Sequence, residues 1–219
     1  MKKQALVVGL GQFGMSVARA LVERGVEVLA VDHREDRVRV AAAFATQAAE
    51  VDATSAEALG GLSPQRRDVC VCAIGDEGKQ AAIICTALLK QLGAKRVVAR
   101  ANDEINHRIL TLIGADHVVN PEREFGERFA NQIIHADIRG EMALGGGLMV
   151  TEAQAPQLFV GRTLRELSLP HRFKVTVVAL RRADTDRVRL PRAEERIEPG
   201  DVLVLVAEDG AVTRMLERV

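Results

Sequence analysis

The stretch Ala5-Leu6-Val7-Val8-Gly9-Leu10-Gly11-Gln12-Phe13-Gly14 decides the fold of the first half of this 219-residue chain. Its apolar run predicts a buried strand, and the Gly-x-Gly-x-x-Gly pattern directly after it predicts a tight turn into a helix. In such a turn Gly9 permits the bend, Gly11 lets backbone N–H groups approach a pyrophosphate, and Gly14 lets helix and strand pack closely. The stretch therefore predicts a nucleotide-binding strand–turn–helix unit.

A carboxylate follows at the spacing that an adenosine ribose requires. Asp32 ends the next apolar run, 18 residues after Gly14, where a carboxylate can hydrogen-bond both ribose hydroxyls. The same charge repels a 2′-phosphate, although Arg34 close by keeps NADP open as a ligand. The structural alternative is that Gly14 is only a packing glycine and Asp32 a solvated strand end. We favour the nucleotide site and include His33, next to Asp32, in it.

Short β-branched runs alternate with helical patterns up to about Asp137. Strands that are apolar nearly throughout predict a parallel sheet covered by helices on both faces. We therefore expect an α/β domain over residues 1–137, a Rossmann-like, doubly wound parallel sheet. The expected strands are 5–8, 26–31, 48–51, 69–74, 96–99 and 117–119. The expected helices are 13–24, 35–44, 55–62, 77–92, 103–113 and 122–137.

Further candidate residues lie at the carboxyl ends of predicted strands, where ligands of open α/β sheets bind. Asp52, Ala53 and Thr54 follow the third strand, and Ile74 and Gly75 follow the fourth. The first group is expected to border the adenine. A plain loop or a helix N-cap is an equally good interpretation of each group.

The pattern changes at the three glycines 145–147. We expect a linker at residues 138–147 and a second, small α+β domain over residues 148–219. Its expected strands are 148–152, 175–180, 187–190 and 202–207, and its expected helices are 163–167 and 210–218.

The last helix of the first half carries an apolar stripe. Asn120 and Pro121 form a well-specified helix start, and Phe125, Phe129 and Ile133 then recur every four residues. An exposed stripe of this length is typical of an interface, so we expect it to pack against a second copy of the chain.

Charge and composition exclude several classes of protein. The 30 basic and 30 acidic residues give a net charge of zero with no basic arm, so no nucleic acid is expected as a partner. The longest uncharged run, residues 4–18, has 15 residues, fewer than the roughly 20 that span a bilayer. Cys70, Cys72 and Cys85 are an odd number in a chain that needs no disulfide, which favours a reducing cytoplasm.

No catalytic group accompanies the glycine loop in the sequence. The five histidines are scattered without metal-ligand spacing, and no Ser, Cys or Thr lies in a nucleophile elbow. Cys70 and Cys72 are too close for zinc or redox spacing and are expected in the core. A dehydrogenase would need a positioned acid or base and a substrate cleft. We expect no enzyme, with a small NAD(P)-dependent oxidoreductase as the rival interpretation.

Motifs along nearly the whole chain resemble one family. They lie at residues 8–14, 31–32, 51–54, 74–75, 98–101, 113–122, 160–167 and 197–203. The stretch from Gly114 to Glu122, followed by GxxLxxL and GDxLxV patterns, is the specific part. The chain is similar to the regulatory subunits of bacterial Trk/Ktr-type potassium uptake systems, which consist of an RCK N-terminal (TrkA-N) domain and an RCK C-terminal (TrkA-C) domain.

The resemblance implies a cytoplasmic, nucleotide-sensing gating-ring subunit at the inner face of the cell membrane. It implies an adenine nucleotide, ATP or ADP first and NAD or NADH second, and an integral-membrane potassium channel subunit of the Trk/Ktr type as partner. Homodimers would form through the sheet domain and the helix after Pro121, and dimers would assemble into an octameric ring. A related alternative is a regulator of a cation/proton antiporter built from the same domains.

The resemblance also implies which residues form the site. The loop on the phosphate side contains Gly9, Gly11, Gln12, Phe13 and Gly14. The ribose and base side contains Asp32, His33, Asp52, Ala53, Thr54, Ile74 and Gly75. Arg100 lies near the nucleotide, and Glu122 helps to bind a divalent cation near the γ-phosphate.

One departure from the family concerns Gln12. ATP/ADP-sensing members carry Arg at this position, which reaches a γ-phosphate across the dimer. The Gln leaves discrimination between ATP and ADP unassigned and keeps NAD or NADH open. Some members bind cyclic di-AMP at the dimer interface of the C-terminal domain, but residues 173–177 do not match that motif clearly.

Overall fold

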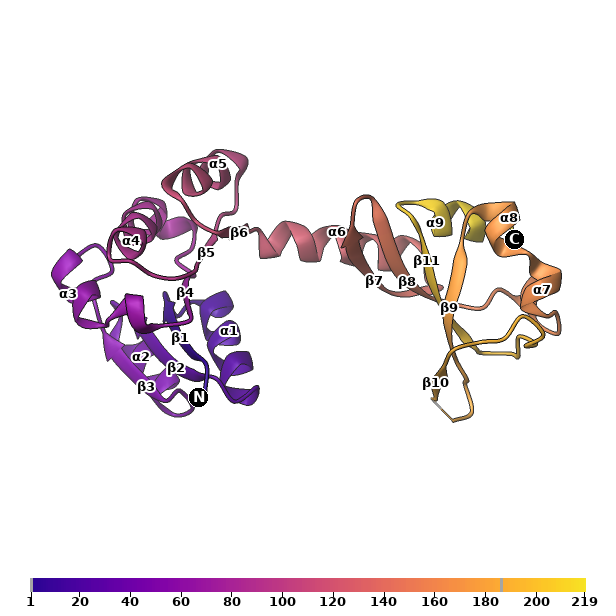
Figure 1. The fold of residues 1–219 in the computed structure, drawn as a ribbon, viewed down its shortest axis with the longest axis horizontal. Coiled ribbons are helices and arrows are strands. Elements are labelled where there is room, and N and C mark those ends of the chain that lie inside the picture. The colour runs from indigo at the N-terminus through magenta and orange to yellow at the C-terminus, as the bar shows by residue number, and fades with distance from the viewer. Residues whose placement is uncertain (1, 186) are drawn as a thin grey trace. The chain divides into compact units, whose positions relative to one another are not determined.

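The structure, a computed structural model, describes residues 2–185 and 187–219. They form two compact units whose boundary lies between Glu124 and Phe125. Each unit has its own sheet (Figure 1) and its own core. Within the described ranges, no helix is long and apolar enough to cross a bilayer.

The first unit is built on a six-stranded sheet of order β3-β2-β1-β4-β5-β6, in which every neighbouring pair is parallel. The chain starts at the centre, and the strand order reverses between β1 and β4, which is where open α/β sheets bind ligands. The predicted Rossmann-like sheet is confirmed. Its strands are β1 (Gln4–Val8), β2 (Glu27–Asp32), β3 (Gln47–Glu50), β4 (Val69–Cys72), β5 (Val97–Arg100) and β6 (His117–Val119).

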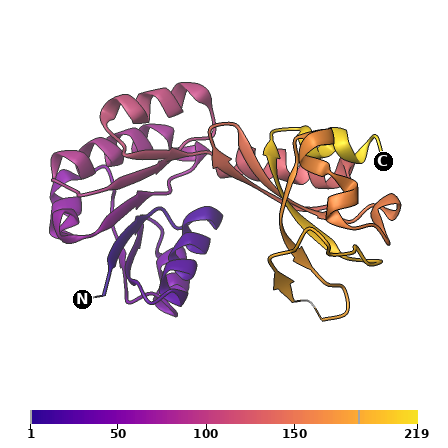
Figure 2. The same cartoon turned by 45° about the vertical axis from the view of Figure 1, so that its right-hand side comes forward.

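Helices cover both faces of this sheet (Figure 2). One face carries α1 (Gln12–Glu23) and α2 (Glu35–Ala42), and the other carries α3 (Ala56–Gly61), α4 (Lys79–Gln91) and α5 (Glu104–Ile113). Successive strand residues point to opposite faces, so both sets of positions must be apolar.

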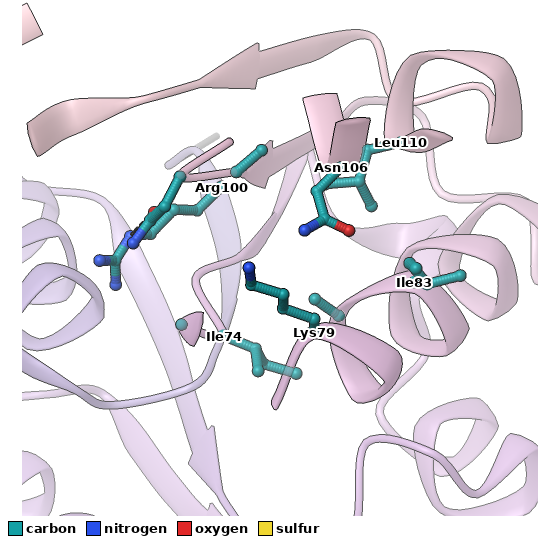
Figure 3. Close-up of a pocket in the computed structure, with 10 residues that line it drawn as sticks. Ile74, Lys79, Ile83, Arg100, Asn106 and Leu110 are labelled. Atoms are coloured by element: carbon teal, nitrogen blue, oxygen red, sulfur yellow. Dashed lines mark hydrogen bonds between the residues drawn. The ribbon is translucent and has the colours of Figure 1, made fainter. Parts of the chain in front are cut away.

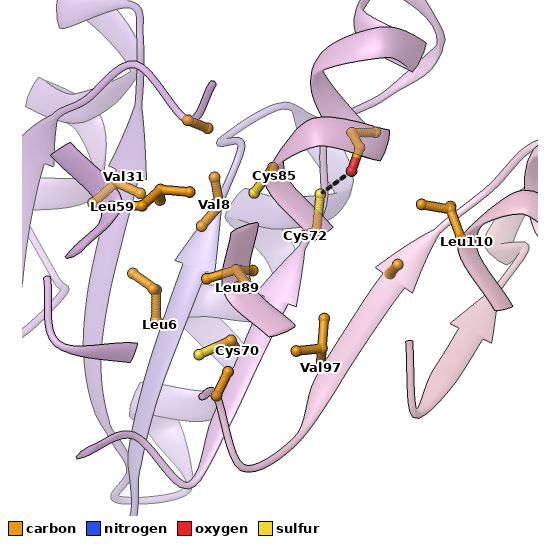
Figure 4. Close-up of a cluster of buried hydrophobic side chains, with 14 of the residues drawn as sticks. Leu6, Val8, Val31, Leu59, Cys70, Cys72, Cys85, Leu89, Val97 and Leu110 are labelled. Atoms are coloured by element: carbon orange, nitrogen blue, oxygen red, sulfur yellow. Dashed lines mark hydrogen bonds between the residues drawn. The ribbon is translucent and has the colours of Figure 1, made fainter. Parts of the chain in front are cut away.

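Strand β4 illustrates this double burial. Cys70 and Cys72 are fully buried on the face that carries Leu89 of α4 (Figure 4). Val71, between them, belongs to the core on the opposite face together with Ala18 of α1. Burial raises the pKa of the Cys70 thiol to about 12. The prediction that these two cysteines pack in the core is confirmed.

The second unit contains a five-stranded antiparallel sheet of order β10-β9-β11-β8-β7. Its core is formed by fully buried side chains such as Phe159, Leu180, Leu203 and Leu205. The predicted α+β class is confirmed. The elements are β7 (Ile138–Gly145), β8 (Leu148–Gln154), α7 (Leu164–Leu167), α8 (Leu169–Phe173), β9 (Thr176–Arg181), β10 (Val188–Arg189), β11 (Val202–Glu208) and α9 (Ala211–Leu216).

The linker predicted at residues 138–147 is wrong, because most of this segment is strand β7. Ile138 is 3% exposed and pairs with Ala153 of β8. All three glycines have positive φ. Gly145 ends β7, and Gly146 and Gly147 form the hairpin turn to β8 rather than a domain boundary. The unit boundary after Glu124 accordingly falls inside α6 (Pro121–Ile134) instead of at residue 137.

Helix α6 keeps its apolar stripe at the surface. The Asn120 side chain accepts a hydrogen bond from the Arg123 N–H at 3.0 Å, as expected for an N-cap. Phe125, Phe129 and Ile133 are 60%, 49% and 67% exposed, and the two phenylalanine rings stack with centroids 5.5 Å apart. Packing of this stripe on a second copy stays a prediction.

Candidate functional site

The glycine loop joins β1 to α1 at the centre of the sheet. Gly9 has φ +91° and donates its N–H to the Val31 carbonyl at 2.8 Å. A Cβ on Gly9 would lie 2.9 Å from the backbone nitrogen of Ile74, and one on Gly14 would lie 1.8 Å from the Gly9 carbonyl oxygen. Both positions therefore exclude a side chain for reasons of backbone packing alone.

Gly11 differs from the other two glycines. It is the N-cap of α1 with φ −65°, and a Cβ there would meet no atom within 4 Å. It provides no side-chain cap, and the first turn of α1 has no acidic residue. The first N–H groups of a helix have no partner inside the helix and carry a partial positive charge, so this end of α1 is suited to an anion.

Asp32 fixes the loop from the end of β2. It is 3% exposed, and its Oδ2 accepts a hydrogen bond from the Leu10 N–H at 2.6 Å. Its Oδ1 accepts one from the Arg34 N–H at 2.9 Å. The alternative of a solvated strand end is therefore wrong. A carboxylate has about four acceptor positions, so Asp32 can hold the loop and still accept from a ribose hydroxyl.

A cleft of about 500 Å³ opens beside the loop at the carboxyl ends of β1, β2, β4 and β5. A hollow of about 230 Å³ adjoins it at the end of β3. The larger volume lies within the range of about 300–1,000 Å³ that is common for small-molecule sites. Residues that line both are Gly9, Asp32, His33, Ile74 and Ala81.

Most of the predicted site residues come together here, although their role in binding stays a prediction. Those that line the cleft or the hollow are Gly9, Gly11, Asp32, His33, Asp52, Ala53, Thr54, Ile74, Gly75 and Arg100. Those outside the lining are Gln12, Phe13, Gly14 and Glu122.

Asp52 and Thr54 form a local turn at the hollow. The Asp52 Oδ1 accepts hydrogen bonds from the Thr54 hydroxyl at 2.7 Å and from the Thr54 N–H at 2.9 Å. These bonds, the hydroxyl's first, hold the pKa of Asp52 below its usual value. Residues 52–54 thus form a loop, as one interpretation predicted, and this loop lines the hollow where the base was expected. The Asp52 carboxylate is charged near neutral pH.

Arg100, the last residue of β5, connects the cleft to two other elements. Its guanidinium carbon lies 5.6 Å from the centroid of the Phe13 ring, and its Nη2 donates to the Glu122 Oε1. Nε donates to the Asn102 Oδ1 at 3.1 Å. In the described part of the chain no three His, Cys, Asp or Glu side chains form a metal site, and the cation that faces Glu122 is Arg100. The divalent-cation role of Glu122 stays a prediction.

A narrower hollow, with room for about one water molecule, lies beside Arg100 between α4 and α5 (Figure 3). Lys79 forms a 2.8 Å ion pair there with Asp103, which caps α5 by accepting the Asn106 N–H at 2.8 Å. The Asn106 N–H and then Lys79 lower the pKa of Asp103 to about 2. The Lys79 charge is thus partly compensated beside the cleft.

Sequence reasoning missed Arg37 as a cleft residue. Arg34 was expected near the ribose, but its guanidinium pairs with Asp36 at 2.7 Å. Arg37 lines the cleft instead, with Nη1 3.5 Å from the Asp32 Oδ2. Arg37 lies in the first turn of α2, and side chains tilt toward the N-terminus of their helix, which here faces the end of β2. Its position in that turn was the signal that could have identified Arg37. The other missed residues of the cleft are Ala73, Glu77, Gly78 and Ala81.

Comparison with known proteins places this geometry in a family. Residues 5–121 match the TrkA-N domain, and residues 152–219 match the TrkA-C domain. The chain belongs to the TrkA-N/TrkA-C family. The TrkA-N match ends at the start of α6, and the TrkA-C match begins inside β8. The resemblance inferred from the sequence motifs is confirmed.

Relatives of the two-domain chain match it over nearly their full length. It is 34% identical to Ktr system potassium uptake protein C of Bacillus subtilis, over 100% of this chain and 98% of the relative. It is 35% identical to Ktr system potassium uptake protein A of Vibrio alginolyticus, over 98% and 97%. Both alignments therefore extend over the TrkA-N and TrkA-C matches of this chain.

Solved structures confirm the fold. The GsuK channel matches 98% of this chain with a TM-score of 0.68 and 17% identity, and a GsuK channel bound to NAD matches 99% with 0.55 and 24%. This chain spans 39% and 38% of those channel chains. The TrkA-N domain of the inner membrane protein ybaL of Escherichia coli matches 62% of this chain, and 98% of its own, with a TM-score of 0.55 and 19% identity.

Proposed function

We propose that this chain is a nucleotide-sensing regulatory subunit of a potassium uptake system. It binds an adenine nucleotide in the cleft beside the glycine loop and changes the conductance of an integral-membrane partner of the Trk/Ktr type. The observation that carries the proposal is the 34–35% identity to two Ktr system potassium uptake proteins over both domains. The fold alone would not distinguish this function from that of a dehydrogenase.

The order of groups along the cleft supports a nucleotide. The N-terminus of α1 suits phosphates, Asp32 at the end of β2 suits ribose hydroxyls, and the hollow at Asp52 and Thr54 suits a base. Arg100 adds a positive charge on the phosphate side. We place ATP and ADP first and NAD and NADH second. A divalent cation at Glu122 and cyclic di-AMP in the TrkA-C domain are further predicted ligands.

The chemistry of the cleft supports a switch rather than an enzyme. Among the lining residues, the candidate proton-transfer groups are His33, Glu77 and the carboxylates of Asp32 and Asp52. The two aspartates accept hydrogen bonds from backbone N–H groups, and the His33 side chain is 73% exposed. If no reaction follows binding, the free energy of nucleotide binding can instead shift the equilibrium between two conformations of the protein. A ligand shifts two states by its difference in affinity, and a tenfold preference per site is about 1.4 kcal/mol. Several sites in one symmetric assembly add these contributions.

Assembly is part of the proposal. The exposed stripe of Phe125, Phe129 and Ile133 supports a homodimer, and the family resemblance extends this to an octameric ring below the membrane partner. In this arrangement the subunit works at the inner face of the cell membrane, held there by its partner.

Potassium flux into vesicles that contain a Trk/Ktr-type channel subunit tests the proposal. Flux is measured with and without this chain, across ATP, ADP, NAD, NADH and cyclic di-AMP. Gly11→Asp places a negative charge at the N-terminus of α1 and should abolish nucleotide dependence, whereas Gly61→Asp, at an open surface position, should retain it. Equal flux in every condition, although nucleotide binds, would contradict the switch. Nucleotide-dependent turnover of a carbonyl compound would support the oxidoreductase, and an effect on an antiporter alone would support that alternative.

A further inference from the structure

Arg100, the last residue of β5, lines the cleft and also contacts the first turn of α6. Its side chain is 14% exposed, and it lines the cleft together with Gly9, Gly11 and Gly75. A Cβ on Gly75 would lie 3.2 Å from the Arg100 Nη1, so the missing side chain leaves room for the guanidinium at the cleft wall. The group is thus positioned on the side of the cleft where the glycine loop lies.

The contacts of this guanidinium come from three separate segments. Phe13 belongs to the first turn of α1, which begins at the glycine loop, and Asn102 follows β5. Glu122 is the second residue of α6. Helix α6 continues from the first compact unit into the second, whose residues begin at Phe125. One side chain therefore joins the phosphate side of the cleft to the helix that connects the two units.

A phosphate group and the Glu122 carboxylate are competitors for the same guanidinium. Arginine binds either anion through its planar fork of N–H donors, and a phosphate carries more charge and more acceptor oxygens than a carboxylate. The Glu122 side chain is 54% exposed, so water can solvate it after release. Its place in the first turn of α6 stays favourable because of the helix dipole.

We propose that the ion pair between Arg100 and Glu122 is the contact through which this protein senses ligand phosphate. A phosphate at the N-terminus of α1 takes Arg100 from Glu122 and releases the first turn of α6 from the sheet. Glu122 acts as a competitor of the ligand, and α6 transmits occupancy of the cleft. This inference rests on the proposed function only in taking the ligand to be a nucleotide.

Calorimetry in EDTA tests the competition, with ADP and adenosine as ligands. Glu122→Gln removes the competitor, and Glu104→Gln, which removes the same charge from the first turn of α5, is a matched control. An ion pair near the surface stabilises a protein by up to about 1 kcal/mol, which the phosphate must overcome to displace Glu122. Without this competition, Glu122→Gln should bind ADP about two- to fivefold more tightly than the control. Adenosine, which has no phosphate, should bind equally to both variants.

Two results of this experiment would overturn the proposal. One is equal ADP affinity of the two variants in EDTA. The other is an increase in adenosine affinity for Glu122→Gln as large as that for ADP, because the effect would then not depend on phosphate. Wild-type protein that binds none of ADP, ATP and NAD would instead contradict the nucleotide assignment itself, so the two failures are distinguishable.

Repeating the Glu122→Gln measurement in the Arg100→Gln variant distinguishes loss of the ion pair from a general effect of removing a negative charge. In Arg100→Gln, ADP binding should weaken, and adding Glu122→Gln should then leave the affinity unchanged. Hydrogen exchange at the amides of Arg123 and Glu124 should become faster in wild-type protein with ADP but not with adenosine. Exchange that is the same with both ligands, or a full Glu122→Gln effect without Arg100, would contradict the sensing role.

Discussion

Gly14→Ala and Gly11→Ala are expected to impair this protein in different ways, although both add one methyl group to the same loop. A Cβ on Gly14 would lie 1.8 Å from the Gly9 carbonyl oxygen and 3.0 Å from the Cβ of Ala73. Real Cβ atoms do not approach closer than 3.0 Å, so the first contact must open from 1.8 Å to at least that distance. The obstructing atom is backbone, so α1 or the loop must move.

The magnitude follows from the kind of atom that obstructs the methyl group. Overpacking costs about 1–3 kcal/mol, and the need to shift backbone places Gly14→Ala at the upper end, with a loss of about 10 °C in the Tm of the first unit. Gly11→Ala meets no atom within 4 Å and has φ −65°, so it loses at most about 1 kcal/mol, the difference between Gly and Ala at an N-cap. It should, however, weaken nucleotide binding about tenfold, because the methyl keeps the phosphate from the backbone.

Differential scanning calorimetry and binding calorimetry with ADP check both halves of this prediction. Each variant is the control for the other, since the added atoms are identical. A wild-type Tm for Gly14→Ala would refute the packing argument. Wild-type ADP affinity for Gly11→Ala would refute the placement of the phosphate at the N-terminus of α1.

Three further results are expected. Asp32→Ala should weaken ATP, ADP and NAD alike by about 1.5–3 kcal/mol, because the diol contact is common to all three, and unchanged affinity in calorimetry would remove Asp32 from the site. Asp103, with its folded-state pKa lowered to about 2, contributes stability above about pH 4 that is lost as pH falls toward 2; acid unfolding of Asp103→Asn should lack this dependence, and an identical pH profile would contradict it. Phe129→Asp should give monomers or insoluble protein, whereas wild-type protein that sediments as a compact monomer would contradict the interface.

The fold of the first unit could be predicted because its determinants are local. Apolar runs, glycines and helix starts recur along the chain. Connections between parallel strands through a helix are almost always right-handed, which leaves few possible topologies. Strand β7 was missed because it lies at a sheet edge. Ile138 is the only buried residue of this strand, which also contains Arg139, Gly140 and Glu141, so its pattern differs little from that of a loop.

The site could be predicted less completely, because side-chain direction depends on tertiary contacts. Asp32 was identified from its spacing, but its burial and its hydrogen bond to the Leu10 N–H depend on how the loop returns over β2. Arg34 and Arg37 have the same chemistry in the sequence. The neighbouring Asp36 holds Arg34, which leaves Arg37 as the cleft residue.

The pairing of Arg100 with Glu122 is the clearest case of information that the sequence lacks. Both residues were identified, each for a separate role, but nothing in the sequence joins residues that are 22 positions apart. In the sheet, β6 pairs with β5 in a register that sets Val119 opposite Arg100, so the first turn of α6 begins at the same edge. A three-residue strand has too few side chains to specify such a register by itself. The contact that we propose as the sensor therefore arises from strand alignment, and a shift of β6 by one residue would remove it without changing any residue of the cleft.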